Sequence, residues 1–195
     1  MSSILKDRLK ELIIEKAFKY SEEPVFKLVS GRMSKYYFNC KAVTLNPEGM
    51  YLVGNLIFDL IKDMDIKGIG GLTLGADPIA HAVAYTSYLK GKLGIESCRP
   101  IESFVVRKTP KPHGLMQWIE GNVKKGDRVA IVDDVITTGK STIEAINRAK
   151  EAGLEIVKVI ALIDRQEGGR EAVETLGYKL VSIITREEVM ELYRR

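Results

Sequence analysis

One segment, Arg128–Thr142, limits the possible folds of this chain more than any other and reads RVAIVDDVITTGKST. Val129–Val132 is an unbroken apolar run rich in β-branched residues, the pattern of a strand buried on both faces. Two carboxylates, Asp133 and Asp134, follow, and a hydroxyl-rich loop then leads into an amphipathic helix expected to begin near Ser141. In open α/β sheets, ligands bind beyond the carboxyl ends of the strands. The segment therefore predicts an α/β fold with a binding site at that edge.

The loop after the two acids is suited to holding a phosphate group. Backbone amides at a helix N-terminus lack intrahelical acceptors and carry partial positive charge. Gly139 allows close approach of the backbone, and the hydroxyls around it can donate to phosphate oxygens. Asp133 and Asp134 would repel a phosphate, so we expect them to accept hydrogen bonds from sugar hydroxyls or to lie near hydrated Mg²⁺. A ribose phosphate suits both halves, whereas the plain alternative is a capped turn beside two surface acids.

Two known phosphate-binding motifs can be compared with this segment. Gly139-Lys140-Ser141 is similar to the end of a nucleotide-triphosphate P-loop, but that motif needs a glycine five positions earlier, where this chain has Asp134. The segment instead closely resembles the phosphoribosyl pyrophosphate (PRPP) signature of the type I phosphoribosyltransferases. The resemblance implies that the acids bind the ribose hydroxyls and the loop holds the 5′-phosphate. The PRPP-binding residues implied here are Asp133, Asp134, Val135, Ile136, Thr137, Thr138, Gly139, Lys140 and Ser141.

Length, charge and cysteine content exclude several other classes of protein. The 195 residues, 45% hydrophobic and 29% charged, predict a single domain over residues 1–195. The net charge of +4 suits an anionic substrate, and without a long run of like charges we expect no nucleic-acid partner. No apolar stretch approaches roughly 18 residues and the polar N-terminus is no signal peptide, so we expect no membrane contact. Cys40 and Cys98 have no zinc-site spacing and are interpreted as reduced thiols, which predicts a cytoplasmic protein.

The first 45 residues are predicted to form a helix and a small strand region. Ile4–Tyr20 has helical periodicity, and Pro24–Val29 and Tyr36–Cys40 have strand patterns. Residues 30–43, SGRMSKYYFNCKAV, resemble the start of orotate phosphoribosyltransferases, which implies a hood over the active site whose backbone borders the orotate ring. The alternative is a plain hairpin with packed aromatic rings. The family often has Lys before this motif, where this chain has Val29, so a cationic contact is missing or supplied elsewhere.

A second loop of the expected site follows a glycine-rich strand. A helix begins at Asn46-Pro47 and runs to about Met64, a strand follows over Ile66–Leu74, and the next helix covers Ile79–Leu89. The loop at Gly75 between them resembles the second PRPP-contacting loop of the family. Some relatives carry Lys where this chain has Gly75, so only a backbone role is expected there.

A basic segment without periodicity follows a predicted strand at Ser103–Val106. Its cationic and titratable residues are Arg107, Lys108, Lys111 and His113. A solvated basic loop is one interpretation; beside a polyphosphate site, a mobile lid could bring cations to a leaving pyrophosphate and exclude water. The spacing also resembles the flexible loop of orotate phosphoribosyltransferases. That resemblance implies a homodimer in which each subunit lends Lys111 and His113 to the site of its neighbour. There they are implied to act in catalysis with Asp133 and Asp134. All four lid residues are implied to contact PRPP.

Arg165 follows a predicted strand at Val157–Ile163, at the same edge as Asp133. A planar guanidinium suits bidentate recognition of a carboxylate. Orotate has a carboxylate, and the resemblance implies that Arg165 and Thr137 contact orotate, although an Arg at a loop start is the plain alternative. The chain then ends in a helix over residues 168–176, a strand over 178–184 and a helix capped by Thr185 and Glu188.

The resemblance implies a type I phosphoribosyltransferase fold, in which helices flank a mostly parallel sheet and about residues 1–45 form the helix and hood. The implied reaction converts orotate and PRPP to orotidine 5′-phosphate and pyrophosphate in de novo pyrimidine biosynthesis. Mg²⁺ is the implied cofactor, carried mainly by PRPP and water with no direct protein ligand. Two alternatives stay open: a phosphoribosyltransferase that acts on another base, and a non-enzymatic regulator that senses PRPP.

Overall fold

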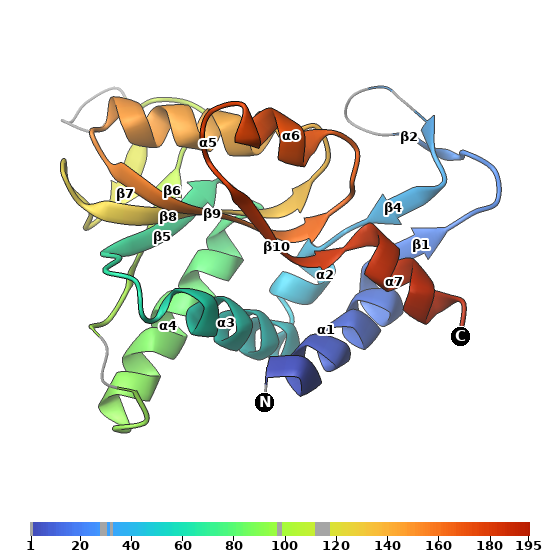
Figure 1. The fold of residues 1–195 in the computed structure, drawn as a ribbon, viewed down its shortest axis with the longest axis horizontal. Coiled ribbons are helices and arrows are strands. Elements are labelled where there is room, and N and C mark those ends of the chain that lie inside the picture. The colour runs from blue at the N-terminus through green and yellow to red at the C-terminus, as the bar shows by residue number, and fades with distance from the viewer. Residues whose placement is uncertain (1, 28–30, 32, 97–98, 112–117) are drawn as a thin grey trace.

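The computed structural model describes residues 2–27, 31, 33–96, 99–111 and 118–195. Its centre is a six-stranded sheet with helices on both faces (Figure 1). In spatial order the strands are β10 (Leu180–Thr185), β9 (Glu155–Asp164), β8 (Arg128–Ile136), β5 (Gly68–Leu72), β6 (Glu102–Val106) and β7 (Ile119–Gly121). Every pairing is parallel except that of β6 with β7. The predicted mostly parallel sheet flanked by helices is therefore confirmed.

The helices lie in two layers because side chains of the central strands alternate between the faces. One face is covered by α1 (Ser2–Lys16), α3 (Pro47–Ile61) and α4 (Asp77–Lys92), and the other by α5 (Lys140–Glu151) and α6 (Gly169–Glu174). In β8, Ala130 and Val132 pack with the first group, whereas Val129 and Ile131 pack with the second. All four are at most 1% exposed, which confirms the predicted strand buried on both faces.

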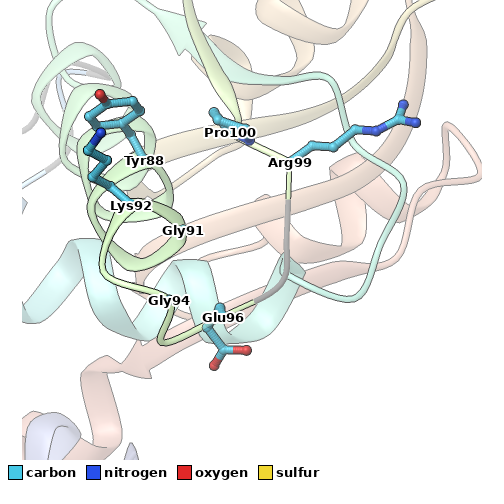
Figure 2. Close-up of a pocket in the computed structure, with 7 residues that line it drawn as sticks. All are labelled: Tyr88, Gly91, Lys92, Gly94, Glu96, Arg99 and Pro100. Atoms are coloured by element: carbon cyan, nitrogen blue, oxygen red, sulfur yellow. The ribbon is translucent and has the colours of Figure 1, made fainter.

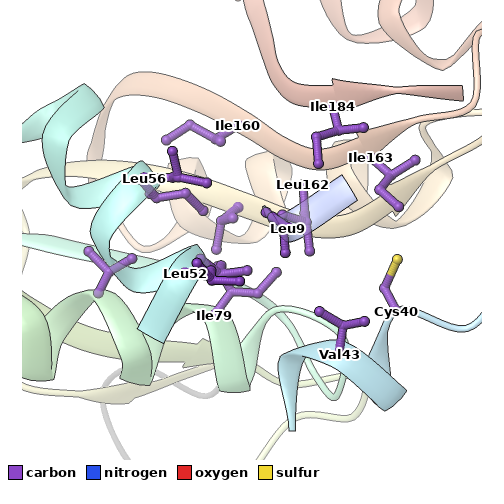
Figure 3. Packing of buried hydrophobic residues seen from close by; sticks show 14 of the residues in the cluster. Leu9, Cys40, Val43, Leu52, Leu56, Ile79, Ile160, Leu162, Ile163 and Ile184 are labelled. Carbon is purple, nitrogen blue, oxygen red and sulfur yellow. The ribbon is translucent and has the colours of Figure 1, made fainter. Parts of the chain in front are cut away.

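The larger core cluster connects the N-terminal region to the sheet. Figure 3 shows Leu9 of α1 and Leu52 of α3 close to Leu162 of β9, with Cys40 and Val43 at the same cluster. Val43 belongs to α2 (Lys41–Thr44), a short helix that was not predicted from the sequence. Burying Val43 and Cys40 fixes the backbone of this short helix against the core.

The hood consists of four short strands in two antiparallel pairs, and its two predicted strand regions do not pair with each other as a plain hairpin would. These are β1 (Phe18–Tyr20), β2 (Phe26–Lys27), β3 (Met33–Ser34) and β4 (Tyr36–Phe38). β1 pairs with β4, and β2 pairs with β3, both antiparallel. The prediction of a helix through Tyr20 was wrong beyond Lys16, because the ring of Phe18 packs 4.9 Å from that of Phe38 across the β1–β4 pair.

Two further element boundaries agree with the sequence patterns, and one segment differs from them. The Asn46 side chain accepts hydrogen bonds from the amides of Glu48 and Gly49, which confirms the predicted start of α3. Thr185 and Glu188 form the predicted capping box of α7 (Arg186–Tyr193). Residues 119–121, expected to be irregular, form β7 instead.

Within the described ranges, no helix is long and apolar enough to cross a lipid bilayer.

Candidate active site

A cavity of about 420 Å³ lies over the carboxyl end of β8, where the sequence predicts the binding site. Its lining residues are Lys27, Tyr37, Phe38, Lys41, Asp133, Asp134, Val135, Ile136, Thr137, Thr138, Gly139, Lys140, Ser141 and Arg165. The fold thus brings the acidic pair, the hydroxyl-rich loop and Arg165 together around one space. The acidic pair lies within β8, which continues to Ile136, rather than just after the strand as expected.

A second cavity of about 650 Å³ lies at the C-terminal end of α4, far along that helix from the sheet edge. Figure 2 shows that its charged side chains do not converge: Arg99 points away from Lys92 and from Tyr88. Glu96, also on its wall, is already paired with Lys62 at 2.6 Å. The convergent polar groups that characterise a ligand site are in the smaller cavity.

The predicted phosphate loop, residues 137–141, takes its shape from two glycines. Gly139 is the N-cap of α5 and has a φ of +82°, a conformation that side chains disfavour. A Cβ at Gly139 would lie 3.0 Å from the carbonyl oxygen of Gly169, and a Cβ at Gly169 would lie 2.8 Å from that of Thr137. The start of α6 therefore lies directly behind the loop. Because Gly139 has no side chain with which to cap α5, the first amides of this helix point toward an external acceptor.

Asp133 is held inside the site by two hydrogen bonds. Its Oδ2 accepts from Thr142 Oγ1 at 2.7 Å, and its Oδ1 accepts from the amide of Asp134 at 3.0 Å. Asp133 is only 6% exposed. Burial, together with the charge of Asp134, raises the pKa of Asp133 to about 7. Asp133 thus links β8 to the first turn of α5.

Asp134 is the more accessible acid of the pair, with 13% of its side chain exposed. Its Oδ2 lies 3.3 Å from Lys41 Nζ, and its Oδ1 accepts from the Val135 amide. Oδ1 also lies 2.5 Å from the point that a Cβ at Gly75 would occupy. A side chain at position 75 would therefore have to displace this carboxylate. Lys41 was not among the site residues predicted from the sequence, because a single lysine after a short strand carries no spacing signal.

Arg165 connects the rim of the sheet to the hood. It is 5% exposed, and its Nη2 donates to Ser34 Oγ at 3.0 Å and to the Tyr36 carbonyl oxygen at 3.3 Å. Nη2 also forms an ion pair of 2.8 Å with Glu167. The guanidinium therefore already interacts with one carboxylate inside the protein. A substrate carboxylate at Arg165 would join or replace Glu167.

Lys27 of β2 adds a cation to the same cavity. Because Val29 departs from the family pattern, the sequence left open whether a cationic contact is supplied elsewhere. Val29 itself lies outside the described residues. Lys27 is a cation close to that position in sequence, and it reaches the cavity beside Tyr37.

The three predicted lid cations that the structure describes, Arg107, Lys108 and Lys111, do not line this cavity. Glu120 on β7 binds both Arg107, with an Nη1–Oε1 distance of 2.9 Å, and Lys111. Hydrogen bonding by Lys111, and then by Arg107, keeps the pKa of Glu120 below its usual value. β6 and β7 are separated from β8 by β5, so this cluster starts two strands away from Asp133.

The structure also describes Lys108 and Trp118 of the predicted lid segment. The ring of Trp118 packs under the Arg148 guanidinium of α5 at 3.5 Å, which anchors the start of β7 to the helix behind the phosphate loop. Lys108 is exposed at the end of β6, and His113 lies outside the described residues.

The acidic pair alone does not form a complete metal cage. Among the described residues, no group of three or more His, Cys, Asp or Glu side chains could hold a metal ion. Two neighbouring carboxylates beside the predicted phosphate loop nevertheless suit Mg²⁺, which keeps several waters and binds through one or two carboxylates and substrate phosphates.

Comparison with known proteins places this site in a family. The phosphoribosyl transferase domain model matches residues 95–192. Orotate phosphoribosyltransferase of Aquifex aeolicus is 44% identical over 190 residues, which cover 97% of this chain and 100% of that protein. The structure of Mycobacterium tuberculosis H37Rv orotate phosphoribosyltransferase with Fe(III) dicitrate has a TM-score of 0.80 and 34% identity, covering 95% of this chain and 98% of that one. A structure of the same enzyme in complex with PRPP has a TM-score of 0.75 and 32% identity over the same shares. This chain therefore belongs to the orotate phosphoribosyltransferases of the phosphoribosyltransferase family.

Proposed function

We propose that this protein transfers the ribose 5-phosphate group of PRPP to orotate, giving orotidine 5′-phosphate and pyrophosphate in pyrimidine biosynthesis. The observation that carries the proposal is a cavity in which a phosphate-type loop, an acidic pair and a buried Arg face one another. The family membership and the PRPP complex of the Mycobacterium tuberculosis relative support it.

The residues that line the cavity indicate where each part of PRPP binds. The 5′-phosphate lies against Thr137–Ser141, where amides and hydroxyls of the α5 N-terminus donate to its oxygens. Asp134 accepts hydrogen bonds from the ribose hydroxyls. Asp133 contributes chiefly by fixing Asp134 and Thr142, because both of its oxygens already accept hydrogen bonds within the protein.

Orotate lies between the sheet rim and the hood. Arg165 binds the orotate carboxylate, a planar pairing that a guanidinium favours. Thr137 and the hood residues Tyr37 and Phe38 border the ring from the other sides of the cavity. Lys27 supplies a further positive charge for this anionic base.

Positioning and electrostatics carry the reaction, so no protein nucleophile is needed. The anomeric carbon gains oxocarbenium character as its bond to pyrophosphate breaks and its bond to the orotate ring nitrogen forms. Asp134 could hold Mg²⁺ through water, and the ion, when bound with PRPP, would supply charge neutralisation at the diphosphate. Arg107, Lys108, Lys111 and His113 stabilise the departing pyrophosphate.

The lid completes the cavity of a neighbouring subunit in a homodimer. This arrangement is supported by the placement of Arg107 and Lys111, which are held by Glu120 on the edge hairpin and not at their own chain's cavity. An exposed apolar row, which a second copy would cover, runs along α4 through Tyr85, Tyr88 and Leu89 and ends at Leu93 just after the helix. The chain acts as a single domain, residues 1–195, in the cytoplasm.

The direct test is to incubate the protein with PRPP and Mg²⁺ and to follow the loss of orotate, uracil, adenine and hypoxanthine in separate reactions. Turnover of orotate alone is the expected result. Turnover of another base, but not of orotate, would contradict the substrate. PRPP binding without turnover of any base would favour a regulator that senses PRPP.

A further inference from the structure

Lys41 is a cavity residue that neither the sequence motifs nor the proposed reaction assigns. It is the first residue of α2, and its neighbours Cys40 and Val43 are buried in the core. The backbone of Lys41 is therefore fixed, while 46% of its side chain stays exposed. The side chain lines the cavity beside Asp134.

The ammonium group of Lys41 lies close to the acidic pair but is not locked to it. Its contact with Asp134 Oδ2 is 3.3 Å long. A half-exposed lysine with a long contact to a carboxylate contributes little to folding stability. The pair therefore leaves Lys41 available to an incoming anion, because an ammonium on a four-carbon stem can move to another acceptor without loss of its backbone position.

The surroundings of Asp134 indicate which anion this is. The other carboxylate oxygen of Asp134 lies against Gly75, in the loop between β5 and α4. Lys41 and Asp134 thus lie side by side on the cavity wall, and Gly75 packs against the far oxygen of Asp134. The 5′-phosphate is assigned to the loop at Gly139, so a ribose held by Asp134 directs its diphosphate away from that loop, toward the part of the wall formed by Lys41.

We propose that Lys41 is a further substrate-binding residue whose ammonium group donates to the diphosphate of PRPP. The inference rests on the proposed function, because it takes PRPP as the ligand of this cavity. In the free protein Lys41 pairs with Asp134. When PRPP binds, the ammonium moves to a diphosphate oxygen and Asp134 accepts from the ribose, so the cation also reduces repulsion between that carboxylate and the phosphates.

The test is calorimetric titration of PRPP, pyrophosphate and ribose 5-phosphate, each with Mg²⁺, into the wild type and into Lys41→Met, Lys41→Arg and Lys35→Met. Lys35 is a matched control, since it is an exposed hood lysine that does not line the cavity. Lys41→Met should weaken PRPP and pyrophosphate binding about 10-fold or more, the effect of losing one charge-assisted hydrogen bond. Ribose 5-phosphate binding should change less than threefold, and Lys41→Arg should restore most of the affinity for PRPP. Lys35→Met should bind all three as the wild type does.

A double variant separates direct binding from an effect through Asp134. If Lys41 only held Asp134, Lys41→Met would cause no further loss of PRPP affinity in an Asp134→Asn background, and that result would overturn the proposal. A persisting loss supports direct binding. Equal weakening of ribose 5-phosphate and PRPP would also overturn it. If the wild type itself fails to bind PRPP, the proposed function fails, and the role of Lys41 with it.

Discussion

Thr142 donates a 2.7 Å hydrogen bond to Asp133, and this bond joins the first turn of α5 to the end of β8. Both residues are almost fully buried, at 1% and 6% exposure. The phosphate loop runs between these two residues, so the bond fixes both ends of that loop relative to each other. Asp133 and Thr142 together therefore help to fix the conformation of the predicted phosphate loop.

Removing the hydroxyl should affect both stability and PRPP binding. Thr142→Val keeps the side-chain shape but leaves Oδ2 of Asp133 without a donor, which should lower the free energy of unfolding by about 1–3 kcal/mol. The Michaelis constant for PRPP should rise several-fold. Thr175→Val is the control, because its hydroxyl bonds a backbone carbonyl on the exposed side of α6 and lies away from the cavity. Denaturant titration and steady-state kinetics measure both effects; identical behaviour of the two variants would refute this role.

The raised pKa of Asp133 predicts a specific dependence of stability on pH. The native pKa is about 7, against a value near 3.8 for an unperturbed group, so the native state retains a proton that the unfolded state loses. The contribution of Asp133 to stability is therefore present below about pH 4 and is lost as the pH rises to about 7. Asp133→Asn removes this titration.

Unfolding free energies of wild type and Asp133→Asn, measured at intervals across this pH range, test the dependence. As the pH rises, the wild type should lose stability relative to the variant, at a slope of up to about 1.4 kcal/mol for each step of one in pH. Subtracting the unfolding free energy of the variant from that of the wild type at each pH cancels the contribution of the other titrating groups. Parallel stability curves would show that Asp133 titrates normally in the native state.

Lys111 should matter for turnover more than for binding. Lys111→Ala should reduce the turnover number by roughly 10²–10³, the scale for losing one preorganised donor, with a smaller change in PRPP affinity because the contact forms mainly during reaction. Single-turnover kinetics with saturating PRPP measure the step. An unchanged rate would remove Lys111 from the mechanism.

Subunit mixing tests whether the lid is shared. A heterodimer of Lys111→Ala and Asp133→Asn chains has one site with neither substitution if the lid crosses the interface. Such a mixture should recover part of the wild-type activity, whereas each variant alone should not. Lack of recovery in a verified heterodimer would mean that each lid serves its own chain.

Glu120 should compete with pyrophosphate for the lid cations, because it binds Arg107 and Lys111 in the free protein. Glu120→Gln should therefore tighten pyrophosphate inhibition about two- to fivefold, the range expected when partly exposed ion pairs are lost. Glu102→Gln is the matched control, since Glu102 pairs with Lys67 at the start of β6, whereas Arg107 follows the end of that strand. Weaker inhibition in Glu120→Gln would indicate that Glu120 orients the cations for binding instead.

Arg165→Lys tests how orotate is recognised. Lysine keeps the charge but loses the planar fork, so the Michaelis constant for orotate should rise by about 10- to 100-fold while that for PRPP changes little. Because Arg165 donates hydrogen bonds to Ser34 and Tyr36, the substitution should also lower the stability of the fold. The melting temperature of the variant is therefore measured alongside its kinetics. A selective effect on PRPP would place Arg165 at the other substrate.

The central part of the site could be predicted from sequence because its signals are local. The buried run of β8, the acids, the phosphate loop and the start of α5 are consecutive, so their order along the chain determines their arrangement. The same holds for the capping box at Thr185 and Glu188, which lie close together in sequence. Strand, loop and helix signals all agree in these segments.

The hood and the paired cations could not be predicted in the same way. Strands of two or three residues carry little periodicity, and pairing β1 with β4 depends on aromatic contacts between distant segments. Lys41 and Asp134 are 93 residues apart, and Arg165 and Ser34 are 131 apart. Such contacts arise only once the whole sheet has formed.

The contact between Gly139 and Gly169 has a consequence for how this chain can vary. Two backbone segments lie close together there, so main-chain atoms form the back of the predicted phosphate loop, while the Thr142–Asp133 bond fixes its ends. In homologous sequences, Thr and Ser should therefore replace each other readily within residues 137–141. Adding even a methyl group at Gly169, well downstream in the chain, should displace the predicted phosphate loop from behind without touching any ligand.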